Sequence, residues 1–380
     1  MDAQRQQLID AVRDAAAGGR TLRLRGAGTK DFWGAGLQGE VLDTRGYAGL
    51  ISYEPSELVV TVRCGMPLAE LKELLAAQGQ CLPFEPPHFG PGATVGGMVA
   101  AGLAGPARAS VGAVRDYVLG LRMVNGRGED LFFGGQVMKN VAGYDVSRLM
   151  AGSWGTLGLI TEVCLKVLPV VPAEVTLNAA GLGQAQALAL LHRWGGQPLP
   201  LNASAWVHDR SSAPAQDHLF VRLRGARAAV ESAVQRMSAD AQAQGAQVQR
   251  MDPVQAAQDW CASAEQKLPF FQAPADDLCL WRLSLPQTAP VLDLGFETYI
   301  EWQGAQRWLW APAQAAQALR EAAQQVGGHA TLFRPSQRHP ELDRAVGVST
   351  PLDAVQQRIQ RQLQAQMDPQ GVFATNRMGV

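Results

Sequence analysis

The stretch Pro91-Gly92-Ala93-Thr94-Val95-Gly96-Gly97-Met98-Val99-Ala100-Ala101-Gly102-Leu103-Ala104-Gly105-Pro106 decides the fold of this chain. It carries no charged side chain, and it holds too much glycine and proline for an ordinary core helix. Glycine lets backbone N–H groups approach a ligand closely, and a Gly-Gly pair opening a short helix of small residues presents free amides to an anion. The stretch therefore predicts a dinucleotide site whose walls come from the rest of the chain.

The composition limits the class of protein. A chain of 380 residues is long enough for two domains with substantial cores. A net charge of −1 argues against nucleic acid as a partner. Leu8, Ile9 and Val12 follow helical spacing, unlike a signal peptide, and the uncharged run 89–107 is too rich in glycine and proline for a membrane helix. We therefore expect a cytoplasmic protein with no segment inserted in a membrane.

The spacing of cysteine and histidine argues against a metal centre. The five cysteines form no CxxC pair, so free thiols are expected rather than ligands of an iron–sulfur cluster. The histidines are isolated from one another and show no His-x-x-x-His spacing. The sequence predicts no metal site.

Two further glycine-rich turns precede the long stretch. A strand over 21–25 runs into Gly26-Ala27-Gly28-Thr29-Lys30, whose amides can point one way and form an anion-binding nest. A plain loop is the alternative, and the turn taken alone favours it. Gly34-Ala35-Gly36-Leu37-Gln38-Gly39 fits the letters GxGxxG, but a strand over 40–43 follows where a fingerprint would open a helix. We discard it as a nicotinamide site.

Hydrophobic periodicity divides the chain at Pro169-Val170-Val171-Pro172. Before this point we expect helices over 4–17 and after Pro67, and strands over 50–53, 58–62, 117–124, 131–133 and 160–167. Beyond it we expect strands over 174–179, 203–208, 219–224, 278–285, 298–302 and 308–310, with helices over 184–194, 227–244 and 312–326. This order favours an antiparallel, ferredoxin-like α+β sheet with helices on one face. The predicted domains are 1–170, 171–345, and a C-terminal helix and tail over 346–380, the helix being capped by Thr350-Pro351.

Three glycine-rich segments stand in fixed order: 25–29, 90–105 and Trp154-Gly155-Thr156-Leu157-Gly158-Leu159-Ile160-Thr161-Glu162. With Asp368-Pro369-Gln370-Gly371-Val372-Phe373, they resemble the FAD-binding domain of the vanillyl-alcohol oxidase/p-cresol methylhydroxylase (PCMH) family. The resemblance is close over 20–170. It implies an α+β fold in which two subdomains over 1–170 surround FAD and the C-terminal tail returns to the flavin.

A narrower resemblance rests on other segments. Phe84-Glu85-Pro86-Pro87-His88-Phe89-Gly90, residues 139–145 and Gly327-Gly328-His329-Ala330-Thr331-Leu332-Phe333-Arg334 are similar to the FAD-binding E subunits of bacterial glycolate oxidases. In that family the first loop would hold the pyrophosphate, the long stretch would line the diphosphate, ribose and flavin, and the third segment would edge the adenine or the ring system. The cofactor-binding residues implied are Arg25, Gly26, Ala27, Gly28, Thr29, Lys30, Pro91, Gly92, Ala93, Thr94, Gly96, Gly97, Ala101, Gly102, Gly105, Gly155, Thr156, Gly158, Leu159, Ile160, Asn376 and Arg377.

Two departures from the family pattern bear on the chemistry. Relatives with a covalent flavin carry His just after the first-loop glycines. Thr29 stands there, so we expect dissociable FAD rather than a link through Cys81 or another thiol. Relatives that oxidise 2-hydroxy acids carry a His-rich, metal-binding signature that this sequence lacks. His329, His88 and Tyr299 are the nearest candidates for acid–base work, and a structural role is favoured for each. The sequence assigns no catalytic residue.

The resemblance implies one of two activities. The first is the FAD-binding subunit of a multi-subunit glycolate oxidase that forms glyoxylate, with a paralogous FAD subunit and an iron–sulfur subunit as partners that would hold it at the inner membrane. The second is a self-sufficient FAD-dependent oxidase or dehydrogenase of another small hydroxy acid or alcohol. An assembly subunit that has lost its cofactor is disfavoured by the intact glycine segments. Core packing is favoured for most tryptophans of the second half, whereas Trp308 and Trp310 would suit a subunit interface if that pair were exposed.

Overall fold

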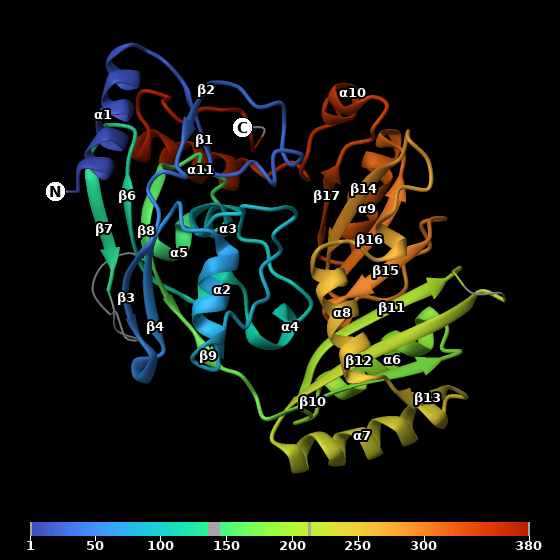
Figure 1. Ribbon diagram of the computed structural model, residues 1–380. Helices are drawn as coiled ribbons and strands as arrows, with labels where there is room; N and C mark the ends of the chain where they lie inside the picture. The colour runs from blue at the N-terminus through green and yellow to red at the C-terminus, as the bar shows by residue number, and fades with distance from the viewer. Residues whose placement is uncertain (1, 136–144, 212–213, 379–380) are drawn as a thin grey trace. The chain divides into compact units, whose positions relative to one another are not determined.

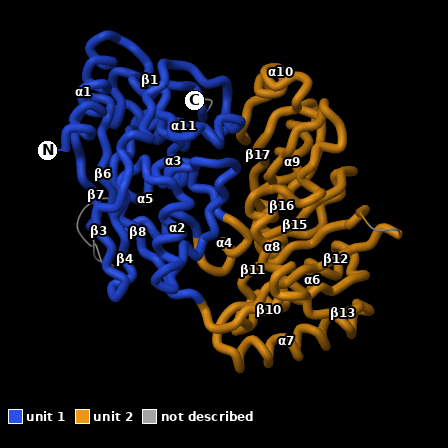
Figure 2. Tube along the Cα trace, viewed as in Figure 1, with its two compact units in different colours: residues 1–104, 113–170, 351–380 blue, residues 105–112, 171–350 orange. Residues whose placement is uncertain are grey.

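The computed structural model describes residues 2–135, 145–211 and 214–378, and the chain forms two compact units (Figure 2). Unit 1 holds residues 1–104, 113–170 and 351–380, and unit 2 holds residues 105–112 and 171–350. These units differ from the expected domains in two places. Residues 105–112 belong to unit 2, and the chain returns to unit 1 at Pro351 rather than at 346. The motif residues 139–144 lie outside the described part of the chain.

Unit 1 is built on a five-stranded antiparallel sheet in the order β3-β4-β8-β6-β7 (Figure 1). Strand β4 reads Val-Val-Thr-Val-Arg and is buried at its first four positions, as a strand covered on both faces should be. A separate parallel pair, β1-β2, carries the first glycine turn at the end of β1. The elements are α1 (Ala3–Ala17), β1 (Leu22–Arg25), β2 (Glu40–Asp43), β3 (Leu50–Glu54), β4 (Val59–Arg63), α2 (Leu68–Ala76), β5 (Gln80–Cys81), α3 (Val95–Ala101), β6 (Val118–Val124), β7 (Asp130–Gly134), α5 (Val146–Met150), β8 (Leu159–Lys166), β9 (Leu168–Pro169) and α11 (Ala354–Met367).

Unit 2 is an eight-stranded antiparallel sheet in the order β13-β10-β12-β11-β15-β16-β14-β17. Its apolar clusters join one sheet face to α6 and α7 at one end, through residues such as Trp206, and to α9 at the other, through residues such as Trp281. The elements are α4 (Arg108–Val111), β10 (Ala173–Ala180), α6 (Gln184–Gly195), β11 (Leu201–Asp209), β12 (Gln216–Gly225), α7 (Arg227–Gln242), β13 (Gln247–Arg250), α8 (Pro253–Ala264), β14 (Cys279–Ser284), β15 (Thr298–Glu301), β16 (Gln306–Ala311), α9 (Ala316–Gln325), β17 (His329–Arg334) and α10 (Pro340–Arg344).

Helix α8 corrects the expectation that all helices of unit 2 cover one face of the sheet. Its Trp260 donates from Nε1 to Oγ1 of Thr176 at 3.0 Å, and Thr176 alternates along β10 with Leu177, which lies in the cluster under α6 and α7. Because neighbouring residues of a strand point to opposite faces, α8 lies on the other face. The sequence predicted no helix here, since Val254 and Trp260 are its only large apolar residues and they mark its apolar face weakly.

The C-terminal helix begins later than expected. Asp353 caps α11 by accepting from the amides of Val355 and Gln356 at 2.8 Å each, whereas the Thr350 hydroxyl hydrogen-bonds Ala330 of β17. No residue of α11 is buried, and Val355 and Ile359 are 53% and 57% exposed. After the helix, the tail returns to β1, where the Leu22 amide donates to the Val372 carbonyl at 2.7 Å. Among the described residues, no helix is both long and apolar enough to cross a bilayer.

Candidate functional site

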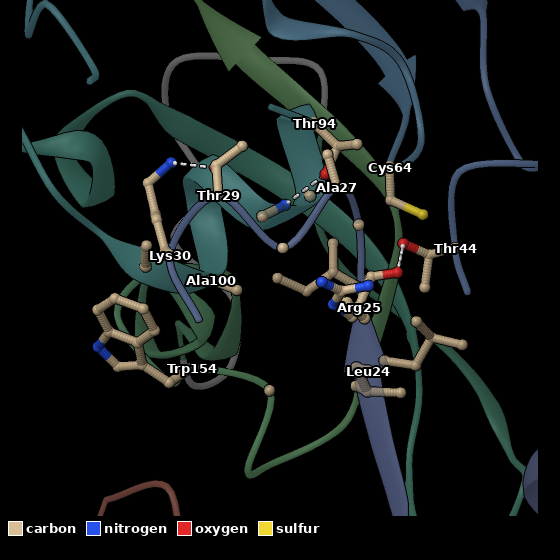
Figure 3. A pocket seen from close by; sticks show the side chains of 18 of the residues that line it. Leu24, Arg25, Ala27, Thr29, Lys30, Thr44, Cys64, Thr94, Ala100 and Trp154 are labelled. Atoms are coloured by element: carbon tan, nitrogen blue, oxygen red, sulfur yellow. Dashed lines mark hydrogen bonds between the residues drawn. The ribbon is translucent and has the colours of Figure 1, made fainter. Parts of the chain in front are cut away.

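A cavity in unit 1 brings the three glycine-rich segments together (Figure 3). The turn after β1 supplies one wall, α3 the second, and the segment leading into β8 the third, with Arg377 of the C-terminal tail beside them. The lining residues are Leu24, Arg25, Gly26, Ala27, Gly28, Thr29, Lys30, Asp31, Thr44, Cys64, Thr94, Gly96, Gly97, Ala100, Ala101, Trp154, Gly155, Gly158, Leu159, Ile160 and Arg377.

Unbonded backbone amides mark the first and third walls. The N–H groups of Ala27, Gly28, Thr29 and Gly155 donate to no acceptor among the described residues. Gly28 and Gly155 have φ of +71° and +77°, a left-handed conformation that glycine adopts without strain. Several such donors in one cavity suit a ligand with anionic oxygens.

The amides of α3 correct one part of the sequence prediction. The expectation was that the Gly-Gly pair at the start of this helix presents free N–H groups. Instead, the Gly96 amide donates to the carbonyl of Cys64 at 2.8 Å, and the Gly97 amide donates to Oγ1 of Thr94 at 3.2 Å. These glycines line the cavity by leaving space rather than by donating hydrogen bonds.

Glycine residues allow the walls of this cavity to approach each other closely, because they carry no side chain. A Cβ on Gly26 would lie 2.4 Å from Oγ1 of Thr94, and a Cβ on Gly96 would lie 2.7 Å from the Cβ of Cys64. Both distances are too short for real atoms, so alanine at either position would push the walls apart. Narrow walls with unbonded donors fit a dinucleotide, whose two phosphates need several N–H groups and little neighbouring bulk.

Charged and reactive groups of the cavity are largely held in place by neighbours. Nε of Arg25 donates to Asp31 at 2.7 Å, and Nζ of Lys30 donates to the His88 carbonyl at 3.2 Å. Burial raises the pKa of the Cys64 thiol to about 12, which keeps it protonated. A covalent flavin link through Cys64 is therefore disfavoured.

The discarded GxGxxG segment has a structural use. Gly34 has φ of +97°, and a Cβ there would lie 2.6 Å from the carbonyl oxygen of Arg377. That carbonyl accepts from the Ala35 amide at 3.1 Å, and the Thr375 carbonyl accepts from the Gln38 amide at 3.4 Å. The segment binds the C-terminal tail, and β2 follows it.

Fifteen of the residues expected at the cofactor line this cavity. Of the others, Thr156 and Asn376 line a small neighbouring hollow of unit 1, and Gly105 belongs to unit 2. Those expected but absent from the lining are Pro91, Gly92, Ala93, Gly102, Gly105, Thr156 and Asn376. Six further lining residues were not expected from the sequence, namely Leu24, Asp31, Thr44, Cys64, Ala100 and Trp154. Leu24, Asp31, Ala100 and Trp154 adjoin predicted positions, whereas no sequence signal marks Thr44 or Cys64.

The acid–base candidates lie outside this lining. Nε2 of His88 lies 3.5 Å from Nζ of Lys72. Tyr299 is a buried residue of unit 2 whose hydroxyl lies 3.2 Å from Oγ of Ser263, and burial raises its pKa far above the ordinary value. His329 begins β17 in unit 2. No geometry here identifies a catalytic base.

The two tryptophans considered for an interface are packed within unit 2. Trp308 is 4% exposed, and its Nε1 donates to Glu301 at 2.7 Å. Nε1 of Trp310 donates to the Phe270 carbonyl at 2.7 Å. Core packing, which the sequence favours, holds for Trp308, and Trp310 is half-buried, so the two do not form the exposed pair that an interface would need.

Comparison with known proteins identifies the family. Residues 3–133 match the family described as the FAD binding domain. The chain is 41% identical over 373 residues to the glycolate oxidase subunit GlcE of Escherichia coli (strain K12), which covers 98% of this chain and 97% of that protein. The chain belongs to the GlcE family. Its FAD-binding domain and PCMH-type α+β fold, expected from the sequence, are thereby confirmed.

More distant proteins share part of the GlcE-family chain or its fold. The glycolate oxidase subunit GlcD of Bacillus subtilis (strain 168) is 33% identical over 130 residues, which is 34% of this chain and 27% of that protein. A solved structure of alkyldihydroxyacetonephosphate synthase has a TM-score of 0.67 at 14% identity and covers 98% of this chain and 75% of that chain. The relatives found by sequence are FAD-linked oxidoreductases, and this chain is one too.

Proposed function

We propose that this chain is the FAD-binding subunit of a multi-subunit glycolate oxidase, in which glycolate is oxidised to glyoxylate and electrons pass to partner subunits. The observation that carries the proposal is the 41% identity to GlcE of E. coli across 98% of the chain. The cavity of unit 1 supports it, because its lining combines small residues with unbonded amides at Ala27, Gly28, Thr29 and Gly155.

Different residues of the cavity would hold different parts of FAD. The unbonded amides would donate to the diphosphate, and the cationic side chains of Arg25 and Lys30 would offset its charge. Ala100, Ala101 and Gly158 would leave room for flat groups against the backbone. When bound, FAD supplies a two-electron acceptor for the hydroxy acid. Glyoxylate forms as glycolate loses two electrons and two protons.

The proposal includes partners. The region shared with GlcD of B. subtilis covers only 34% of this chain, as expected for two flavoprotein subunits that share an FAD domain and differ elsewhere. We include a paralogous FAD subunit and an iron–sulfur subunit, because electrons that leave glycolate need a path to an acceptor. The complex would be cytoplasmic and attached to the inner membrane through these partners.

Anaerobic flavin spectra test the proposal. The FAD-loaded chain is purified alone and together with the partner subunits of its own host, and glycolate is added to each sample. We expect the absorbance near 450 nm to persist in the isolated chain and to bleach in the complex. Full bleaching of the isolated chain would instead support a self-sufficient oxidase. A chain that takes up no FAD would overturn the proposal.

A further inference from the structure

We propose that a cavity in unit 2 binds an uncharged aromatic molecule of about two rings. The cavity measures about 700 Å³ and lies between the sheet and the segment that follows β13. Strands β10, β11, β12, β15 and β16 contribute to one wall, and α8 with residues 268–278 forms the other. A space of this volume, closed on two sides, suits a small molecule.

Aromatic rings form part of the lining. Phe220, Trp260, Phe270, Tyr299 and Trp310 all line the cavity. The ring centres of Phe270 and Tyr299 are 5.3 Å apart with their planes at 31°. A planar ring can enter such a group by offset or edge-to-face contacts, which add to the free energy of burial.

The polar tips of these rings are already hydrogen-bonded to protein. Nε1 of Trp260 donates to Thr176 and Nε1 of Trp310 donates to the Phe270 carbonyl. Oγ of Ser263 donates its one proton to Glu301 at 3.0 Å, so the Tyr299 hydroxyl must donate to Oγ of Ser263. The rings therefore offer apolar surface to a ligand and leave few polar groups for it to satisfy.

The negative charge of the lining disfavours anionic ligands. The lining includes the carboxylates of Asp209, Asp259 and Glu297, against the single guanidinium of Arg210, which pairs with Glu297 at 3.0 Å. Asp209 and Asp259 remain as an excess of negative charge. A hydroxy acid or a phosphate would be repelled, whereas an uncharged ring system would not.

Equilibrium dialysis of the FAD-loaded chain tests the proposal. The probes are N-phenyl-1-naphthylamine, which is uncharged, and 8-anilinonaphthalene-1-sulfonate, which has a similar ring system and a negative charge. We expect one molecule of the uncharged probe per chain and an affinity for the anionic probe that is lower by about tenfold or more. Equal affinities, or no saturable binding, would overturn the proposal.

Substitutions in one helix locate the binding. Ala256 is buried and lines the cavity from α8, while its neighbour Ala257 is exposed and does not. We expect Ala256→Phe to lower the affinity for the uncharged probe by about tenfold or more, and Ala257→Phe to leave it unchanged. Thermal unfolding of each variant, followed by far-UV circular dichroism, reports whether it folds. Val207→Trp, at a half-buried lining position of β11, makes the same test from the sheet if Ala256→Phe fails to fold. Unchanged binding in a folded lining variant would contradict the assignment.

Discussion

The guanidinium of Arg377 lies 4.8 Å from the ring centre of Trp154, although 222 residues separate them in the sequence. On its other side Trp154 stacks on Trp33, with ring centres 4.0 Å apart and planes at 7°. Nη2 of Arg377 also donates to the Lys30 carbonyl at 2.6 Å. Burial lowers the pKa of Arg377 to about 10, which leaves it cationic at neutral pH. These contacts hold the C-terminal tail against two walls of the cavity that we propose for FAD.

Replacing Arg377 should loosen the tail and weaken FAD binding. Arg377→Met keeps much of the apolar stem and removes both the cation–π contact and the hydrogen bond, each worth about 1 kcal/mol. We expect the dissociation constant of FAD to rise by about tenfold or more and the melting temperature to fall. Fluorescence titration of the apoprotein with FAD measures the first effect. Arg358→Met, at an exposed position of α11, is the control and should bind FAD as the wild type does.

Alanine at Gly26 should disrupt the same cavity by steric overlap. The new Cβ would lie 2.4 Å from Oγ1 of Thr94, and overpacking of this kind costs about 1–3 kcal/mol. We expect Gly26→Ala to weaken FAD binding by about tenfold or more. Gly46→Ala, at an exposed site where a Cβ meets no atom within 4 Å, should have no effect.

A double variant tests whether the clash with Thr94 causes the loss of FAD affinity in Gly26→Ala. If Gly26→Ala acts by displacing Thr94, then Gly26→Ala combined with Thr94→Ala should cost less than the sum of the two single changes, because the second removes the clashing hydroxyl and methyl. Additive losses of FAD affinity would show that the clash with Thr94 is not the cause.

Cys64 should resist alkylation at any pH at which the protein stays folded. Its pKa of about 12 means that at pH 9 about one thiol in a thousand is ionised, and only the thiolate reacts. The ionised fraction rises about tenfold per pH unit up to the pKa. Iodoacetamide followed by mass mapping should modify the exposed Cys261 and leave Cys64 intact. Modification of both at equal rates would contradict the burial of Cys64.

FAD should leave the protein on acid denaturation. The first-loop position that carries His in relatives with a covalent flavin is Thr29, and the cavity thiol is kept protonated by burial. We therefore expect trichloroacetic acid to precipitate a colourless protein and to release all the FAD into the supernatant. A yellow pellet would show a covalent bond.

The sequence pattern alone predicts the structure correctly where neighbouring residues determine the backbone conformation. The turn after β1 is one case, since its glycines and the strand before it follow directly from 21–30. The amides of Gly96 and Gly97 show the limit. Their acceptors are a carbonyl on Cys64 and the hydroxyl of Thr94, and the first of these comes from a different element. Hydrogen-bond satisfaction of this kind depends on tertiary contacts that spacing does not reveal.

Capping shows how tertiary contacts override a local signal. Thr350-Pro351 has the letters of a helix start, but the Thr350 hydroxyl exchanges hydrogen bonds with Ala330 of β17 and is not available. Asp353 caps α11 in its place, and Gln356 completes a capping box by accepting from the Asp353 amide at 3.2 Å. Either residue satisfies the sequence pattern, and the position of β17 decides between them.

Glu162 should contribute more to stability than an ordinary surface carboxylate. Its Oε1 accepts from Nη1 of Arg5 at 2.7 Å and from the Tyr47 hydroxyl at 2.8 Å, and its Oε2 lies 3.4 Å from Nε of Arg122. Its side chain is 17% exposed, so little water would replace these partners. We expect Glu162→Gln to lower the free energy of unfolding by about 2 kcal/mol, since it leaves the half-buried guanidinium groups of Arg5 and Arg122 with one shared carboxylate, that of Asp130, instead of two.

An exposed ion pair in the same unit provides the control for this prediction. Glu40 pairs with Arg20 at 2.7 Å, but the two side chains are 60% and 46% exposed. Glu40→Gln should change the free energy of unfolding by less than about 0.5 kcal/mol, because solvent screens the pair and ordering the side chains offsets the gain. Urea denaturation of the FAD-loaded chain measures both variants. Equal effects would mean that the network around Glu162 stabilises unit 1 no more than a surface pair does.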